Sequence, residues 1–230
     1  MRKPMLKSTL LALLVALGAV SIAQAADTWV EGKNYFLVDP PQRTNVAPGK
    51  VEVLEVFSYG CPACNAFEPY IKELRRQLPA NAQMNYLPAS FQVAEDWPMF
   101  QRAFLTAQLL GLVDKTQDAI YDEVWKSTDA PLSTLAAPNR LKSPLPTIED
   151  AAKVYNRLTG VSVDKFLATA KSFTVDLKMK QADAQVIAYQ VDQTPTLIVN
   201  GKYRITQGSA GGPNQVIALV KYLVTKETRS

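Results

Sequence analysis

Two cysteines, Cys61 and Cys64, are the only cysteines among the 230 residues, and two residues separate them. Pro62 suits the first position of a helix, which places the pair at a helix start behind an apolar, β-branched run. A disulfide across so short a loop would stabilise a fold by only about 2 kcal/mol. A zinc site would need two further ligands, and the sequence has no histidine. The spacing is therefore most typical of reversible thiol–disulfide exchange.

The expected position of Cys61 favours a sulfur anion. Unpaired N–H groups and the positive end of the helix dipole meet at a helix N-terminus. We therefore expect the pKa of the Cys61 thiol to lie below its ordinary value of about 8.5. Cys64 lies one turn further along, and we expect it to stay protonated and to resolve mixed disulfides. A stable thiolate favours the reduced protein, so the disulfide would be a strong oxidant.

The composition excludes several other classes of protein. With 47% hydrophobic and 20% charged residues, the chain is typical of a globular protein. The absence of histidine excludes a histidine-ligated metal centre and a histidine-based catalytic triad. We expect neither a metal nor another cofactor.

The first 25 residues have the layout of a secretory signal peptide. Three basic residues precede an apolar run at 10–20, and Ala23 and Ala25 form an A-x-A cleavage pattern. The apolar run is shorter than a membrane span requires. We therefore expect residues 1–25 to be removed on export, with an uncleaved N-terminal anchor as the alternative.

Export also determines the expected surroundings. Removal of residues 1–25 takes away three of the 25 basic residues and none of the 21 acidic ones, which leaves a net charge of +1. So weak a charge gives no electrostatic support for a nucleic-acid partner. Disulfides persist in oxidising compartments, and we expect the protein to work in a bacterial periplasm.

The order of elements predicts an α/β fold with an inserted helical domain. Apolar, β-branched runs predict five strands, at 33–38, 51–57, 84–87, 196–199 and 203–206. Helical patterns dominate from about 93 to 189, apart from an irregular, proline-containing loop at 127–146. Asn200-Gly201 predicts a tight hairpin, the glycines within 208–212 predict a flexible turn, and Pro213 begins a last helix. We expect one domain over 26–230, interrupted by the helical insertion at about 93–189.

Two stretches of sequence resemble a known family. Residues 54–64, LEVFSYGCPAC, with Phe67 and Glu68 after them, resemble the DsbA family of thiol:disulfide oxidoreductases. Residues 193–201, QTPTLIVNG, are similar to the cis-proline strand of thioredoxin-like proteins. The order of elements is similar to the family over nearly all of residues 34–226.

The resemblance implies a thioredoxin fold and a definite activity. A protein of this family would donate its Cys61–Cys64 disulfide to newly exported, unfolded proteins through a mixed disulfide. A quinone-linked membrane partner of the DsbB type would then reoxidise it. We expect a periplasmic monomer.

Pro195 begins a predicted strand, where a proline leaves the preceding backbone groups free. The resemblance implies that the Thr194–Pro195 peptide bond is cis, so that the Thr194 backbone could pair with an extended substrate beside Cys61. The alternative is an edge-strand proline in the trans form. We expect substrates to contact exposed apolar surface around Tyr59, Pro62, Ala63 and Thr194.

Glu55 is an acid within an apolar strand, on the same strand face as Phe57. Burial would raise its pKa and would suit it to accept the proton of Cys64. The family that the chain resembles carries a buried acid here and often pairs it with a lysine on the next strand. Residues 81–90 contain neither Lys nor Arg, so the sequence does not supply that charge partner. The alternative is a partly exposed edge glutamate.

Ala63 departs from the family pattern, which has histidine between the proline and the second cysteine. The Ala63 side chain offers no hydrogen bond to the thiolate, and each tenfold loss of thiolate stability is worth about 30 mV. We still expect an oxidant, because Pro62 and the helix terminus remain. A disulfide isomerase or reductant is the enzymatic alternative, and a chaperone-like binding module for unfolded chains is the alternative without catalysis.

Overall fold

Strand β2 (Val51–Phe57) lies inside the main sheet, between two other strands, and is buried at all seven positions in the computed structural model of the protein. The structure describes residues 29–229, so the expected signal peptide at 1–25 lies outside the described residues. Within that range the main sheet has the strand order β1-β7-β6-β2-β3. The strands are β1 (Phe36–Leu37), β2, β3 (Ala82–Pro88), β6 (Thr196–Val199) and β7 (Tyr203–Thr206), with a separate hairpin of β4 (Leu135–Ala137) and β5 (Arg140–Leu141).

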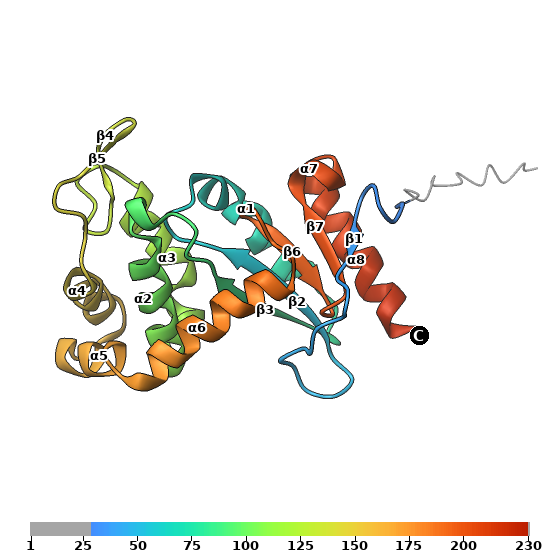
Figure 1. Cartoon of the computed structure of the whole chain (residues 1–230), viewed down its shortest axis with the longest axis horizontal. Helices are drawn as coiled ribbons and strands as arrows, with labels where there is room; N and C mark the ends of the chain where they lie inside the picture. The colour runs from blue at the N-terminus through green and yellow to red at the C-terminus, as the bar shows by residue number, and fades with distance from the viewer. Residues whose placement is uncertain (1–28, 230) are drawn as a thin grey trace, which may run out of the picture.

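Eight helices and a short 3-10 turn complete the described part of the chain (Figure 1). Their bounds are α1 (Pro62–Gln77), η1 (Val93–Glu95), α2 (Trp97–Leu109), α3 (Val113–Trp125), α4 (Ile148–Thr159), α5 (Val163–Ala170), α6 (Phe173–Ala188), α7 (Gln207–Ala210) and α8 (Pro213–Thr228). Between residues 29 and 229 no helix is both long and apolar enough to cross a bilayer.

Alternation along β2 divides the core between the two faces of the sheet. Val51 and Val53 pack with α1 and α8 in one apolar cluster. Leu54 and Val56 point the other way and pack with Ala182 of α6. Helices therefore cover both faces of the sheet. Burial of both faces fixes the register of β2, because a shift by one residue would move each side chain to the other face.

Strand β2 pairs in parallel with β3 and antiparallel with β6. The parallel pair requires a crossover connection, which α1 supplies. The same crossover places the start of α1, and with it Cys61, directly after the end of β2. The antiparallel pair brings Thr196 opposite Val56, so the residues before β6 lie at the same end of the sheet.

The helices α2 to α5 form a block beside the sheet, and α6 runs back from this block to the sheet (Figure 1). Their shared core includes Phe100 and Phe104 of α2, Tyr155 of α4 and Phe166 of α5, all almost fully buried. Phe57 at the end of β2 contacts Phe104 with ring centroids 5.2 Å apart. The block is thereby tied to the strand that leads to the two cysteines, and the expected thioredoxin fold with an inserted helical domain is confirmed.

The structure corrects three local expectations. The strand predicted at 33–38 is only the two-residue β1, which pairs with the edge of β7. The region 127–146 is not wholly irregular, because it contains the β4–β5 hairpin, with Asn139 at positive φ in its turn. The glycine-containing segment at 208–212 is not a flexible turn: Thr206 caps the short helix α7, and Gly211 ends it at φ 94°.

Candidate active site

Cys61 is the N-cap of α1, as the sequence predicts, and Pro62 is the first residue of the helix. The Cys61 sulfur accepts a hydrogen bond from the backbone N–H of Cys64 at 3.2 Å. A sulfur at the N-cap thus takes the place that a hydroxyl or carboxylate oxygen usually fills, which satisfies an unpaired helix donor. Both cysteines are free thiols and both are buried, Cys61 being 4% exposed and Cys64 fully enclosed.

The two sulfurs have opposite acidities. The side-chain hydrogen bond from Cys64 is the largest effect that lowers the pKa of Cys61 to about 6; burial opposes it, and contacts with Thr194 and with the N–H groups of Cys64 and Ala63 support it. Burial, followed by the hydrogen bond to Cys61, raises the pKa of Cys64 well above its usual range. At neutral pH the reduced pair is therefore one thiolate and one thiol.

Thr194 faces Cys61 from the other side of the site. The Cys61 thiol lies 3.6 Å from the Thr194 carbonyl oxygen and donates to it when protonated. When the sulfur is ionised, the Thr194 side chain favours the anion and lowers the pKa of Cys61. The Thr194–Pro195 peptide bond is cis, as the resemblance implied. The Thr194 side chain thus favours the thiolate in addition to the donors at the start of α1.

Glu55 is completely buried beneath the cysteines, which excludes the exposed edge position. Burial raises its pKa well above the usual range, and the carboxyl of Glu68 and the sulfur of Cys61 add to this effect. Within the described residues neither carboxyl oxygen of Glu55 has a hydrogen-bond partner. Such surroundings favour the protonated, neutral form of this acid.

Glu68 is a second buried acid, four residues after Cys64 on α1. Burial, followed by the neighbouring carboxyl of Asp118 on α3, raises the pKa of Glu68 to about 8. The sequence pattern predicted no role for Glu68 beyond its place in the stretch that resembles the family. Its spacing from Cys64 is the signal that could have found it, because residues i and i+4 share one helix face.

The cation that the sequence lacked on β3 comes from α1. Arg75 donates one N–H to the hydroxyl of Tyr86 at 3.2 Å and another to both carboxylate oxygens of Asp118, at 3.1 and 3.2 Å. Tyr86 is the β3 residue paired with Glu55 in the sheet. Arg75 lowers the pKa of Glu55, although burial and Glu68 outweigh it. Sequence spacing could not reveal this arrangement, because it joins α1, β3 and α3.

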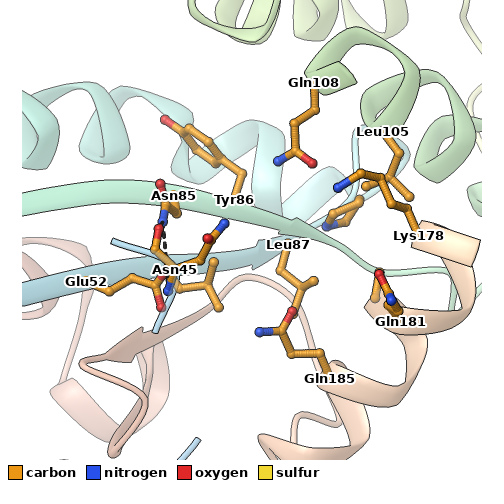
Figure 2. A pocket seen from close by; sticks show the side chains of 13 residues that line it. Asn45, Glu52, Asn85, Tyr86, Leu87, Leu105, Gln108, Lys178, Gln181 and Gln185 are labelled. Carbon is orange, nitrogen blue, oxygen red and sulfur yellow. Dashed lines mark hydrogen bonds between the residues drawn. The ribbon is translucent and has the colours of Figure 1, made fainter. Parts of the chain in front are cut away.

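Glu52 shows how different a buried acid on the same strand can be. It lies on the opposite face of the sheet, in a groove between β3 and α6 with a volume of about 300 Å³ (Figure 2). Its Oε1 accepts hydrogen bonds from Asn85 Nδ2 at 2.6 Å and from the Asn45 N–H at 3.2 Å. Neither cysteine lines this groove.

The surface around Cys61 agrees only in part with the expected substrate contacts. Pro62 and Ala63 are exposed, and Thr194 is half-buried. Tyr59 is not exposed: 99% of its surface is covered, and its hydroxyl donates to Gln117 Oε1 at 2.7 Å. Tyr59 therefore supports the site from inside the helical block. In the described part of the chain no group of three metal-ligating side chains is placed to hold an ion.

Comparisons with known proteins agree with this geometry. The sequence profile of a family described as Thioredoxin matches residues 47–210. The thiol:disulfide interchange protein DsbA of Pseudomonas aeruginosa is 37% identical over 218 residues, which cover 95% of each chain. The DsbA of Azotobacter vinelandii is 36% identical over 197 residues, which cover 85% of this chain and 83% of the relative.

Solved structures show the same similarity. The crystal structure of Pseudomonas aeruginosa DsbA superposes with a TM-score of 0.72 at 36% identity, covering 88% of this chain and 96% of that one. The DsbA of Xylella fastidiosa superposes with a TM-score of 0.74 at 25% identity, covering 87% of this chain and 98% of that one.

The contact between Thr194 and Cys61 leads to a first prediction. Replacing Thr194 by valine keeps the shape of the side chain but removes its hydroxyl. We expect the pKa of Cys61 to rise by about one unit, because a hydrogen bond to a charged group is worth about 1.5 kcal/mol or more. The thiolate absorbance of the reduced protein, followed against pH, measures this shift. Thr194→Ser, which keeps the hydroxyl, should retain the wild-type pKa, and an unchanged pKa in Thr194→Val would exclude the contact.

Proposed function

The chain belongs to the DsbA family of thiol:disulfide interchange proteins, and on this premise we propose that it acts as a periplasmic oxidase of newly exported proteins. The observation that carries the direction of the reaction is the environment of Cys61. Donors from the start of α1 and from Thr194 favour its thiolate, whose pKa is lowered to about 6. A stabilised leaving thiolate makes the reduced protein the favoured product.

The reaction begins when a client thiolate attacks the Cys61 sulfur of the oxidised protein. The Cys61–Cys64 bond breaks, a Cys61–client disulfide forms, and the electron pair leaves on Cys64. A second client thiolate then attacks the client sulfur of the mixed disulfide and releases Cys61 as a thiolate. The client loses two electrons and gains a disulfide, while the protein gains two electrons and ends with one thiol and one thiolate.

Cys64 leaves as an anion in a buried place that disfavours charge, so it needs a proton at once. We assign this proton transfer to Glu55, whose pKa burial raises well above its usual range. Glu55 gives the proton to Cys64 while a client is oxidised, and takes it back when the disulfide is formed again. Glu68 and Arg75 act as positioning residues by setting the charge around Glu55.

The substrate contacts are assigned to the rim of the site. Thr194 and Pro195, the two residues immediately before β6, form a cis segment beside Cys61 with which an extended client can pair. Pro62 and Ala63 supply exposed surface on the other side of the sulfur. These contacts are non-specific, as an enzyme for many unfolded clients requires.

The cellular setting is inferred from the N-terminal sequence and from the family. Residues 1–25 serve as a signal peptide that directs export to the periplasm. Residues 26–230 then form one thioredoxin-like domain with the helical insertion at about 93–189, working as a monomer. Family membership supports reoxidation by a quinone-linked membrane partner of the DsbB type.

Equilibration with glutathione tests the oxidase assignment. We expect a redox potential more oxidising than about −180 mV, the value typical of a disulfide isomerase. The Cys64→Ser variant should accumulate mixed disulfides with reduced client proteins, and Cys61→Ser should form none. A potential near about −270 mV, as in thioredoxins, would identify a reductant instead. Retention of full anti-aggregation effect by Cys61→Ser, without any dithiol oxidation by the wild type, would identify a binding module.

Glu55→Gln tests the proton transfer. Because glutamine cannot exchange a proton with Cys64, we expect the single-turnover oxidation of a dithiol peptide to slow by about tenfold at neutral pH. The control is Glu52→Gln, a buried acid on the opposite face of the same strand, which should leave the rate unchanged.

Although Glu55→Gln should slow oxidation, we expect it to stabilise the folded protein. The pKa of Glu55 is raised in the folded protein, so the unfolded chain ionises first and stability falls as pH rises above the unfolded value of about 4.3. Glu55→Gln removes this loss and should increase the free energy of unfolding at pH 7, as measured by urea denaturation. A variant that is neither slower nor more stable would show that Glu55 has no role in the proton transfer.

A further inference from the structure

A hollow of about 530 Å³ lies beside Cys61, on the side of the helical block. Gly60 and Pro62, the two neighbours of Cys61 in the chain, form part of its wall. The other lining residues include Glu95 of η1, Trp125 at the end of α3, and Leu135 and Leu141 of the β4–β5 hairpin. The hairpin projects from the helical block (Figure 1).

Hydrogen bonds and close packing hold the walls of this hollow in place. The Trp125 indole N–H donates to the Tyr59 carbonyl at 2.8 Å. Because Tyr59 lies two residues before Cys61, this hydrogen bond holds the Trp125 ring close to the active site. Gly60 packs so closely on Trp97 that an added Cβ would lie 2.8 Å from the indole nitrogen. That nitrogen also donates to Glu95 at 3.3 Å, which ties η1 to the same place.

The hairpin wall is anchored as well. The N–H of Lys142 donates to the Thr134 carbonyl at 2.7 Å, and the Leu132 N–H donates to the Glu123 carbonyl of α3 at 2.9 Å. The hairpin nevertheless leaves Leu141 39% exposed. A pocket that is already formed loses little conformational entropy when it binds a ligand.

We propose that this hollow binds a large apolar side chain of the client, a few residues away from the cysteine that attacks Cys61. The inference rests on the proposed oxidase function. Its occupant follows from continuity: Gly60 and Pro62, the chain neighbours of Cys61, are also walls of the hollow, so a client bound at Cys61 can reach the hollow within a few residues. An unfolded client presents such apolar side chains, whereas a folded one buries them.

The charge of the lining restricts which client side chains the hollow can bind. Glu95 is the one charged residue among the described residues that line the hollow. Its carboxylate disfavours an acidic client residue and tolerates a basic one. The hollow therefore adds a preference on one side of the client cysteine, while the Thr194–Pro195 segment contacts the client backbone without regard to sequence.

A peptide series tests this preference. Dithiol peptides of glycine and serine would carry one leucine at successive positions before or after the first cysteine. With the oxidised wild-type protein, we expect single-turnover oxidation to be about fivefold faster when leucine lies on one side, through burial of a single aliphatic side chain. A peptide with aspartate at that position should be oxidised more slowly than a peptide with serine there. The Glu95→Gln variant should oxidise these two peptides at equal rates.

Matched variants locate the effect. Leu141→Ser should bring the leucine-to-serine rate ratio close to one, whereas Leu177→Ser on α6, with a similarly exposed leucine (43%), should keep the wild-type ratio. As a readout of binding alone, a peptide with serine in place of cysteine should shift the NMR signal of the Trp125 indole N–H.

Each remaining outcome has a definite meaning. A ratio of one at all positions in the wild type, or a ratio that survives in Leu141→Ser, overturns the proposal while leaving the oxidase function intact. A Leu141→Ser variant with a normal ratio but slower reoxidation by membranes shows that a membrane partner occupies the hollow, which also overturns it. If the wild type oxidises none of the peptides, the proposed function itself fails.

Discussion

A sulfur anion at residue 61 is stable only because hydrogen-bond donors surround it in a place that otherwise excludes water. The donors come from three sources, the thiol of Cys64, the first N–H groups of α1 and the side chain of Thr194. Each depends on a larger element: α1 follows β2 through a parallel crossover, and Thr194 precedes β6, the antiparallel neighbour of β2. The five-stranded sheet of the described chain thus brings the end of β2 and the start of β6 together beside the Cys61 sulfur.

This arrangement also buries acidic side chains, which lowers the stability of the folded protein. Glu55 and Glu68 lie beneath the cysteines, where burial raises the pKa of both. Arg75 offsets part of this from α1, through its contacts with Tyr86 and Asp118, and so replaces a cation on the neighbouring strand. Proteins often accept such local destabilisation at catalytic sites, because a group that exchanges protons near neutral pH must be held in surroundings that disfavour its charge.

Local sequence patterns predicted much of this site, but they could not predict contacts between residues that are distant in the sequence. The apolar run of β2, the proline after Cys61 and the Asn200-Gly201 turn each act over a few residues, so their elements could be placed from sequence. The roles of Arg75 and Asp118 could not, because helix α3 and strand β3 meet α1 only after folding. Tyr59 was misplaced for the same reason: strand alternation predicts its face, but only the packed helical block shows that this face is covered.

The oxidising power of the disulfide depends on the acidity of Cys61, and titration of the reduced wild-type protein measures this acidity directly. Because Cys64 stays protonated, the change in thiolate absorbance near neutral pH reports Cys61 alone. The structure predicts a midpoint at about pH 6. A midpoint near pH 8.5, the value of an ordinary cysteine, would mean that the donors around the sulfur do not stabilise its anion, and the account of an oxidising disulfide would be wrong.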